Sequence, residues 1–203
     1  IAELAKQWGT PCYIYSKAQL FKQWQSFQEN LQTQRHRICY AVKANSNLSI
    51  LHCLARWGAG FDIVSQGELE RVLAAGGEAN KIIFSGVAKQ TAEIERALTV
   101  GIHCFNVESA AELTRIQQIA ERMGCKARIA LRVNPNIDAM THPYIATGLA
   151  ENKFGIHLTE VLPLYLQAAT LPALEIIGIA CHIGSQLTEL APVLAAIDCL
   201  LKL

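Results

Sequence analysis

The sequence ICYAVK at residues 38–43 is apolar until its final residue, which is a lysine. β-Branched and aromatic side chains in such a run predict a buried strand of a parallel sheet. A lysine at the end of a buried strand sheds water, which lowers its pKa and makes it a nucleophile suited to a Schiff base. The alternative is an ordinary Lys43 whose long stem carries the ammonium group to solvent.

Further apolar runs alternate with helical patterns along the chain. We predict strands at residues 12–15, 38–43, 60–64, 81–85, 103–107, 127–133 and 175–182, with helices at 48–57, 91–100, 159–169 and 189–203. Capping boxes open two more helices after Ser65 and Ser109. This alternation predicts βαβ units and a parallel sheet, either an open doubly wound sheet or a closed (β/α)8 barrel. No glycine-rich phosphate fingerprint follows a strand, which favours an α/β fold of the barrel type, truncated to six βα units.

Composition limits the possible functions. The 203 residues carry a formal net charge of +1, which argues against nucleic acid or an anionic membrane as partner. No apolar run approaches the length of a membrane span. The seven cysteines show no Cys-x-x-Cys spacing and several lie in predicted strands, so we expect reduced, buried thiols in a cytoplasmic protein without a structural metal. The chain starts without Met, and we interpret it as one incomplete domain (1–203) of a longer protein.

Ionisable side chains stand at the ends of the predicted strands, where (β/α)8 barrels place their active sites. Lys43, Asp62, Arg132 and His182 are predicted to converge on one mouth. Each has a structural alternative: Asp62 as a turn cap, Arg132 in an ion pair, His182 as a core histidine. Glu108 and Asn134 are interpreted as loop structure.

A lysine in a barrel mouth serves two Schiff-base chemistries. It attacks a carbonyl substrate directly, or it holds pyridoxal phosphate, whose ring accepts electrons. For the cofactor, His182 offers a flat face, and Gly184 and Ser185 offer phosphate donors if they open a helix. The pattern of residues alone leaves both chemistries open.

Several motifs carry a resemblance to a known family. YAVKAN at 40–45 and FDIVSQGE at 61–68 resemble motifs of the fold-type III pyridoxal phosphate enzymes, the alanine racemase and ornithine decarboxylase group. Four further motifs resemble the diaminopimelate decarboxylases within that group: RVNPN at 132–136, THPY at 141–144, KFGI at 153–156 and HIGSQ at 182–186. The ornithine and arginine decarboxylases match less well.

The resemblance implies roles for six residues. Lys43 forms the internal aldimine with pyridoxal 5'-phosphate, and His182 stacks on the ring. Gly184 and Ser185 hold the phosphate, while Asp62 and Arg132 lie close to the cofactor. The implied reaction is decarboxylation of meso-2,6-diaminopimelate to L-lysine and CO2 by a homodimer.

The resemblance also implies missing parts. The last barrel strands and a C-terminal β domain with a Cys-Glu-Ser motif have no counterpart in this chain, and residues 12–15 belong with that domain in the family. We therefore expect residues 1–203 alone to be inactive. Two rival hypotheses remain: a non-catalytic pyridoxal phosphate-binding barrel of the same superfamily, and an inert scaffold whose Lys43 only reaches solvent.

Overall fold

The computed structural model describes residues 1–138 and 154–203 of the chain. It divides into two compact units, Ile1–Ile38 and Cys39–Leu203. The predicted THPY motif at 141–144 and Lys153 lie outside the described residues, so the structure does not bear on them.

The first unit contains two helices, α1 (Ala2–Trp8) and α2 (Lys17–Leu31). Ser16 begins α2, and its hydroxyl accepts a hydrogen bond from the backbone N–H of Gln19 at 3.2 Å. The strand predicted at 12–15 is wrong. These residues form an exposed loop, because no strand in the described part of the chain pairs with them.

The second unit is built on a parallel sheet. Its strands are β1 (Cys39–Ala41), β2 (Gly60–Ile63), β3 (Ile82–Phe84), β4 (Cys104–Val107), β5 (Ala127–Asn134), β6 (Ile156–His157) and β7 (Leu174–Cys181). The first five pair in sequence order, and β7 pairs with β5 along Ala127–Val133. The short β6 pairs with Val133 and Asn134 at the end of β5. Six of the seven predicted strands are confirmed, and β6 is an addition.

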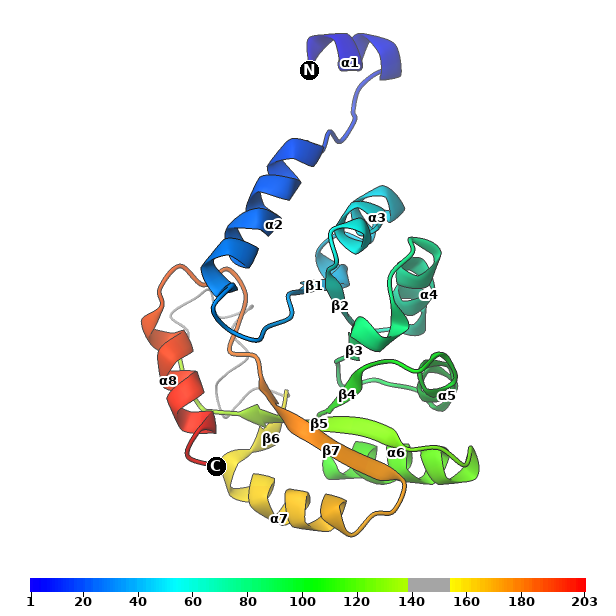
Figure 1. Cartoon of the computed structure of the whole chain (residues 1–203), viewed down its shortest axis with the longest axis vertical. Coiled ribbons are helices and arrows are strands. Elements are labelled where there is room, and N and C mark those ends of the chain that lie inside the picture. The colour runs from blue at the N-terminus through cyan, green and yellow to red at the C-terminus, as the bar shows by residue number, and fades with distance from the viewer. Residues whose placement is uncertain (139–153) are drawn as a thin grey trace. The chain divides into compact units, whose positions relative to one another are not determined.

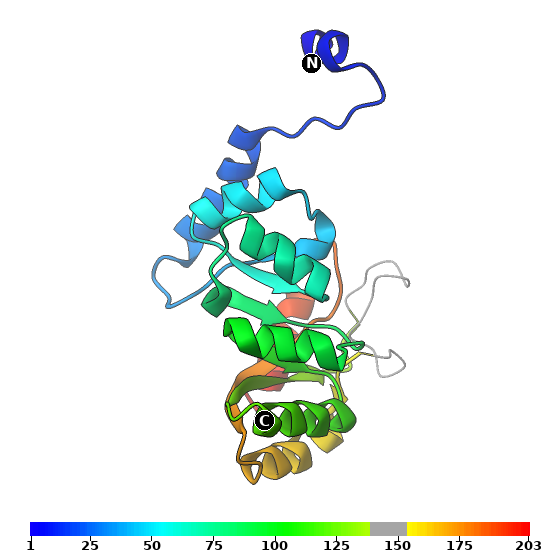
Figure 2. The same ribbon diagram turned by 90° about the vertical axis from the view of Figure 1, so that its right-hand side faces the viewer.

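Five helices follow the strands along the outside of this curved sheet (Figure 1). They are α3 (Leu48–Arg56), α4 (Gln66–Ala74), α5 (Thr91–Val100), α6 (Ala110–Arg122) and α7 (Leu158–Ala169). The view turned by 90° shows the same helices stacked in order against the strands (Figure 2). Both predicted capping residues are confirmed: the hydroxyl of Ser65 accepts from Glu68 N–H, and that of Ser109 from Glu112 N–H. The predicted parallel α/β fold of a truncated barrel is therefore confirmed.

The core lies between the sheet and these helices. Phe61, Phe84 and Phe105 come from adjacent strands and are at most 1% exposed. Leu51, Leu69, Ile94 and Leu113 bury the facing sides of the helices. Each fully buried side chain of this size contributes about 1.5–3 kcal/mol. Since strand side chains alternate between faces, the residues between the core positions point to the other face of the sheet, which is the inside of the barrel.

The last helix, α8 (Ala191–Leu200), starts later than predicted. Pro192 lies in its first turn, where a proline is readily accommodated. Residues 182–190 before it contain no helix. The prediction that Gly184 and Ser185 open a helix is therefore wrong. On its inner side α8 packs Ala196 and Val193 against the residues that follow β7, Ile183 and Leu187.

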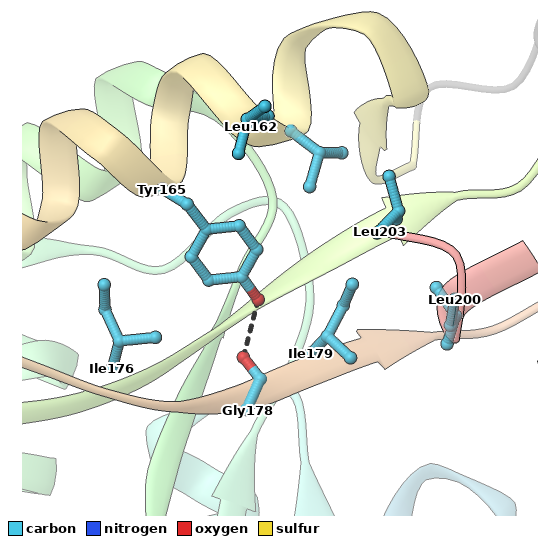
Figure 3. A pocket seen from close by; sticks show the side chains of 8 residues that line it. Leu162, Tyr165, Ile176, Gly178, Ile179, Leu200 and Leu203 are labelled. Atoms are coloured by element: carbon cyan, nitrogen blue, oxygen red, sulfur yellow. Dashed lines mark hydrogen bonds between the residues drawn. The ribbon is translucent and has the colours of Figure 1, made fainter.

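An apolar groove lies between α7, β7 and the end of the chain (Figure 3). Leu162, Ile176, Ile179 and Leu200 line it. The hydroxyl of Tyr165 donates a hydrogen bond to the carbonyl of Gly178 at 2.7 Å and so fixes α7 to β7 (Figure 3). Among the residues that the structure describes, none contributes a carboxylate, amine or imidazole side chain to this groove.

Two expectations from composition can be compared with the structure. Of the seven free cysteines only Cys104 is fully buried, and Cys12 is exposed, so the expectation of buried thiols is wrong for most of them. Among the helices that the structure describes, none combines the length and the apolar character needed to cross a bilayer.

Candidate active site

The carboxyl ends of the strands surround a cavity of about 330 Å³. A volume in this range suits a small molecule. Side chains from β1 to β5 and from the end of β7 contribute to its wall, which is lined by Ala41, Lys43, Asp62, Val64, Ser85, Gly86, Asn106, Arg132, Phe154, Ala180, Cys181, His182 and Ser185. Five of the six predicted site residues are in this wall. The sixth, Gly184, is not, although it directly precedes Ser185.

Lys43 reaches the cavity from a short 3-10 turn, Val42–Ala44, that follows β1. Val42 is fully buried, whereas Lys43 is exposed. The expectation that Lys43 sheds water inside a buried strand is therefore wrong, because the strand already ends at Ala41. The ammonium group nevertheless acts electrostatically on two neighbours. It partly opposes the rise that burial causes in the pKa of Asp62, and it adds to the fall that burial causes in the pKa of His182.

A row of polar side chains crosses the inside of three adjacent strands. Asp62 of β2 and Asn106 of β4 alternate with buried core residues, so they point into the barrel. Between them the hydroxyl of Ser85, directly after β3, donates to Asp62 Oδ1 at 2.6 Å and accepts from Asn106 Nδ2 at 3.0 Å. Burial raises the pKa of Asp62 against the opposing hydrogen bond from Ser85. Asp62 is thus a fixed carboxyl group at the cavity wall and not a turn cap.

His182 directly follows Cys181, the last residue of β7, and its side chain lines the same cavity. Burial lowers its pKa to about 4, and the positive charges of Arg132 and Lys43 add to this effect. The imidazole is therefore neutral at physiological pH. A neutral, planar ring is suited to lie against a heteroaromatic ligand.

Arg132 extends from β5 and is held on two sides. Its Nη1 donates to Glu108 Oε1 at 2.6 Å, and its guanidinium carbon lies 5.1 Å from the centre of the Phe154 ring. Arg132 is therefore both part of an ion pair and part of the cavity wall. The interpretation as loop structure is wrong for Asn134, which is the buried last residue of β5. Glu108 does lie in the loop between β4 and α6, but it is only 6% exposed.

The sequence also did not indicate a role in the site for Lys89 and Glu112, which are linked to Arg132 through Glu108. Lys89 donates from Nζ to Glu112 Oε1 at 2.7 Å and to the carbonyls of Gly86 and Asn106 at 2.7 and 2.8 Å. Burial raises the pKa of Glu112, although the ammonium group of Lys89 opposes the rise. The signal for Glu112 was present in the capping box at Ser109. Lys89 gave none, because it belongs to a polar loop.

These side chains fit pyridoxal phosphate. The cavity wall contains the amine of Lys43, which can react with an aldehyde, the neutral flat ring of His182, and the hydroxyl of Ser185, which can donate to a phosphate. Asp62 and Arg132 provide one charge of each sign in the same cavity. A parallel barrel sheet with these groups at the carboxyl ends of its strands defines the class of pyridoxal phosphate-binding barrels.

Comparison with known proteins identifies the family. Residues 17–203 match the family described as "Pyridoxal-dependent decarboxylase, pyridoxal binding domain". The match covers most of the chain, so the chain belongs to this family. The resemblance inferred from the motifs is confirmed.

Individual relatives extend along the whole chain. Diaminopimelate decarboxylase from Pseudomonas aeruginosa is 56% identical over 203 residues, and that from Haemophilus influenzae is 58% identical over 203 residues. Each alignment covers 100% of this chain and 49% of the relative. The crystal structure of a diaminopimelate decarboxylase variant from Helicobacter pylori complexed with L-lysine superposes with a TM-score of 0.97 at 46% identity, over 99% of this chain and 51% of that one. The chain therefore spans about half the length of the relatives it matches.

Proposed function

We propose that the whole protein catalyses the pyridoxal phosphate-dependent decarboxylation of meso-2,6-diaminopimelate to L-lysine and CO2. The observation that carries the proposal is the cavity in which Lys43, Asp62, Arg132 and His182 meet, in a chain that is 56% identical along its full length to a diaminopimelate decarboxylase. The L-lysine bound to the related enzyme from Helicobacter pylori is the product that this reaction would release.

The proposed roles follow from the chemistry of each group. Lys43 would hold the cofactor through its amine, Nζ. His182, neutral because of its lowered pKa, covers one face of the ring and keeps water away from it. Ser185 and the backbone of Gly184 hold the phosphate. Pyridoxal phosphate, when bound, serves as the sink for the electron pair that the departing CO2 leaves behind.

Asp62 and Arg132 are proposed to orient these groups. The carboxyl group of Asp62 is fixed by Ser85 and provides a counter-charge near the ammonium group of Lys43. Arg132 presents a guanidinium group at the same wall, held by Glu108 and Phe154. Positioning of this kind lowers the entropic cost of bringing substrate and cofactor together.

The surroundings of the whole protein are proposed on the same basis. We propose a cytoplasmic homodimer that acts on a small amino acid, without nucleic acid or membrane as partner. The near-balanced charge of the chain, +1 at pH 7, supports the exclusion of polyanionic partners.

A substrate comparison tests the proposal. The whole protein, loaded with pyridoxal phosphate, is incubated separately with meso-diaminopimelate, L-ornithine and L-arginine, and released CO2 and product amine are measured. We expect CO2 and L-lysine from meso-diaminopimelate, with a kcat/KM at least about 100-fold above the other two, since unmatched polar groups in a site reject an analogue strongly. Decarboxylation of only ornithine or arginine would refute the substrate. Cofactor binding without CO2 from any of them would favour the non-catalytic barrel.

A further inference from the structure

Glu108 joins three separate segments around the cavity through a single buried carboxylate. Its side chain is 2% exposed. Oε1 accepts hydrogen bonds from Arg132 Nη1 at 2.6 Å and from the backbone N–H of Gly86 at 3.0 Å. Oε2 accepts from the backbone N–H of Gly155 at 3.0 Å. These donors come from β5, from the loop after β3 and from the residue before β6.

The contact with Gly155 brings Phe154 to the cavity. Gly155 has a φ of 78°, and a Cβ at this position would lie 3.1 Å from the backbone of Arg132 and of Asn134. Only glycine lets the chain approach β5 so closely in this conformation. Phe154 directly precedes it, and its ring faces the guanidinium group of Arg132. Glu108 thus fixes Arg132 directly and fixes the residue next to its aromatic partner.

The backbone of Glu108 is in turn held by a hydrogen bond to Glu112. Its backbone N–H donates to Glu112 Oε2 at 3.2 Å, and the other oxygen of Glu112 accepts from Lys89 Nζ. Lys89 is completely buried and also donates to the carbonyls of Gly86 and Asn106. The two positive and two negative charges of Lys89, Glu112, Glu108 and Arg132 therefore balance within one connected network.

We propose that Glu108 is a positioning residue for cofactor binding, which holds the guanidinium group of Arg132 and the Phe154 ring at the wall of the pyridoxal phosphate cavity. This role rests on one part of the proposed function, the binding of pyridoxal phosphate in the cavity. It does not depend on the identity of the substrate. Glu108 is absent from the cavity wall, so it acts through Arg132 and not by touching the ligand.

The chemistry of the site requires a carboxylate. All three partners are donors, and an ionised carboxylate accepts on both oxygens. A glutamine of the same shape accepts on one side and turns an N–H2 group towards a donor on the other. The substitution Glu108→Gln therefore breaks at least one of the three contacts and leaves the buried charge of Arg132 without its partner.

A double-mutant cycle tests the proposal in the whole protein. The dissociation constant of pyridoxal phosphate is measured by absorbance titration of the cofactor-free protein for wild type, E108Q, R132Q and the E108Q/R132Q double variant. Thermal unfolding of each cofactor-free variant is recorded separately. E70Q is the matched control: it makes the same change in the Arg96–Glu70 ion pair, a partly exposed pair outside the cavity wall.

The expected pattern is non-additive. E108Q and R132Q should each weaken pyridoxal phosphate binding by about tenfold, and the double variant should bind no more weakly than R132Q, since residues that act through one another do not add. E70Q should leave the affinity unchanged. E108Q affinity within twofold of wild type, or a double variant whose loss equals the product of the two single losses, would overturn the proposal.

One further variant keeps the test decisive. If E108Q does not fold, the cycle is repeated with E108D, which keeps the charge but shortens the side chain. We expect weaker binding that R132Q again masks, and additivity again contradicts the proposal. Because the cycle measures cofactor affinity, its result stands whether or not meso-diaminopimelate proves to be the substrate.

Discussion

At the scale of single residues, the sequence locates charged groups better than it predicts their surroundings. An ionisable side chain closes or interrupts an apolar strand at four positions, Lys43, Asp62, Arg132 and His182, and all four line one cavity. The expectation that Lys43 loses its water is wrong, because the burial of its side chain depends on where the strand ends, and β1 ends at Ala41. The sequence indicates only loop structure for Glu108, because the three partners of its carboxylate are distant in sequence, at Gly86, Arg132 and Gly155.

His182 should make the stability of the cofactor-free protein depend on pH. Its pKa is about 4 when folded and close to 6.5 when unfolded. As the pH falls from about 6.5 to about 4, the unfolded chain binds a proton that the folded protein does not, so the free energy of unfolding decreases. We expect this contribution to reach about 1–2 kcal/mol, since solvent screens part of the shift at a half-buried side chain.

Urea unfolding across this pH range measures the effect. His182→Asn lacks the titrating ring, so its free energy of unfolding should fall less steeply than that of wild type. Asp62, Glu68 and Glu112, whose pKa values are raised mainly by burial, titrate in both proteins and largely cancel in the comparison. Parallel pH profiles for the two proteins would contradict the expectation.

At the scale of elements, most of the long periodic patterns led to correct predictions, whereas the shortest strand could not be predicted. The helix predicted at 91–100 coincides with α5, because its apolar spacing and glycine stop agree. Strand β6 has only two residues, too few for any period, and it exists because of its pairing with β5. Helix α2 was not predicted, although Leu20, Trp24, Phe27 and Leu31 recur at helical spacing.

The approach of β6 to β5 yields a prediction for Gly155. Gly155→Ala should lower the free energy of unfolding of the whole protein by about 2–3 kcal/mol, because it adds a backbone clash to an unfavourable φ. Gly101→Ala is the control, since Gly101 has a similar φ of 71° with nothing within 4 Å of a Cβ. It should cost only about 1 kcal/mol. Equal losses in urea unfolding would show that the close contact with β5 is not important.

At the scale of the whole molecule, the family, the parallel barrel fold and its truncation could all be inferred from the order of the strands and motifs. The described sheet ends at β1 and at β7, and β7 pairs only with β5. Ile176, Leu162 and Leu200 beside it are exposed or partly exposed around the apolar groove. Open strand edges and apolar patches of this kind favour association.

Residues 1–203 prepared alone should therefore associate and bind pyridoxal phosphate weakly. We expect light scattering to give a mass above the 22.3 kDa of a single chain, or aggregation that increases with concentration. Equilibrium dialysis should show incomplete retention of the cofactor. A monodisperse monomer of 22.3 kDa that retains one cofactor per chain would contradict this expectation.

The site of covalent attachment tests the account most directly. The whole protein is loaded with pyridoxal phosphate, reduced with borohydride, digested with trypsin and mapped by mass spectrometry. We predict the reduced cofactor on one peptide, Ile38 to Arg56, with the cleavage after Lys43 missing because the modified lysine resists trypsin. Lys43→Ala should abolish the label. A label on Lys89 or on any other lysine, or an unchanged label in the Lys43→Ala variant, would contradict the central role assigned to Lys43.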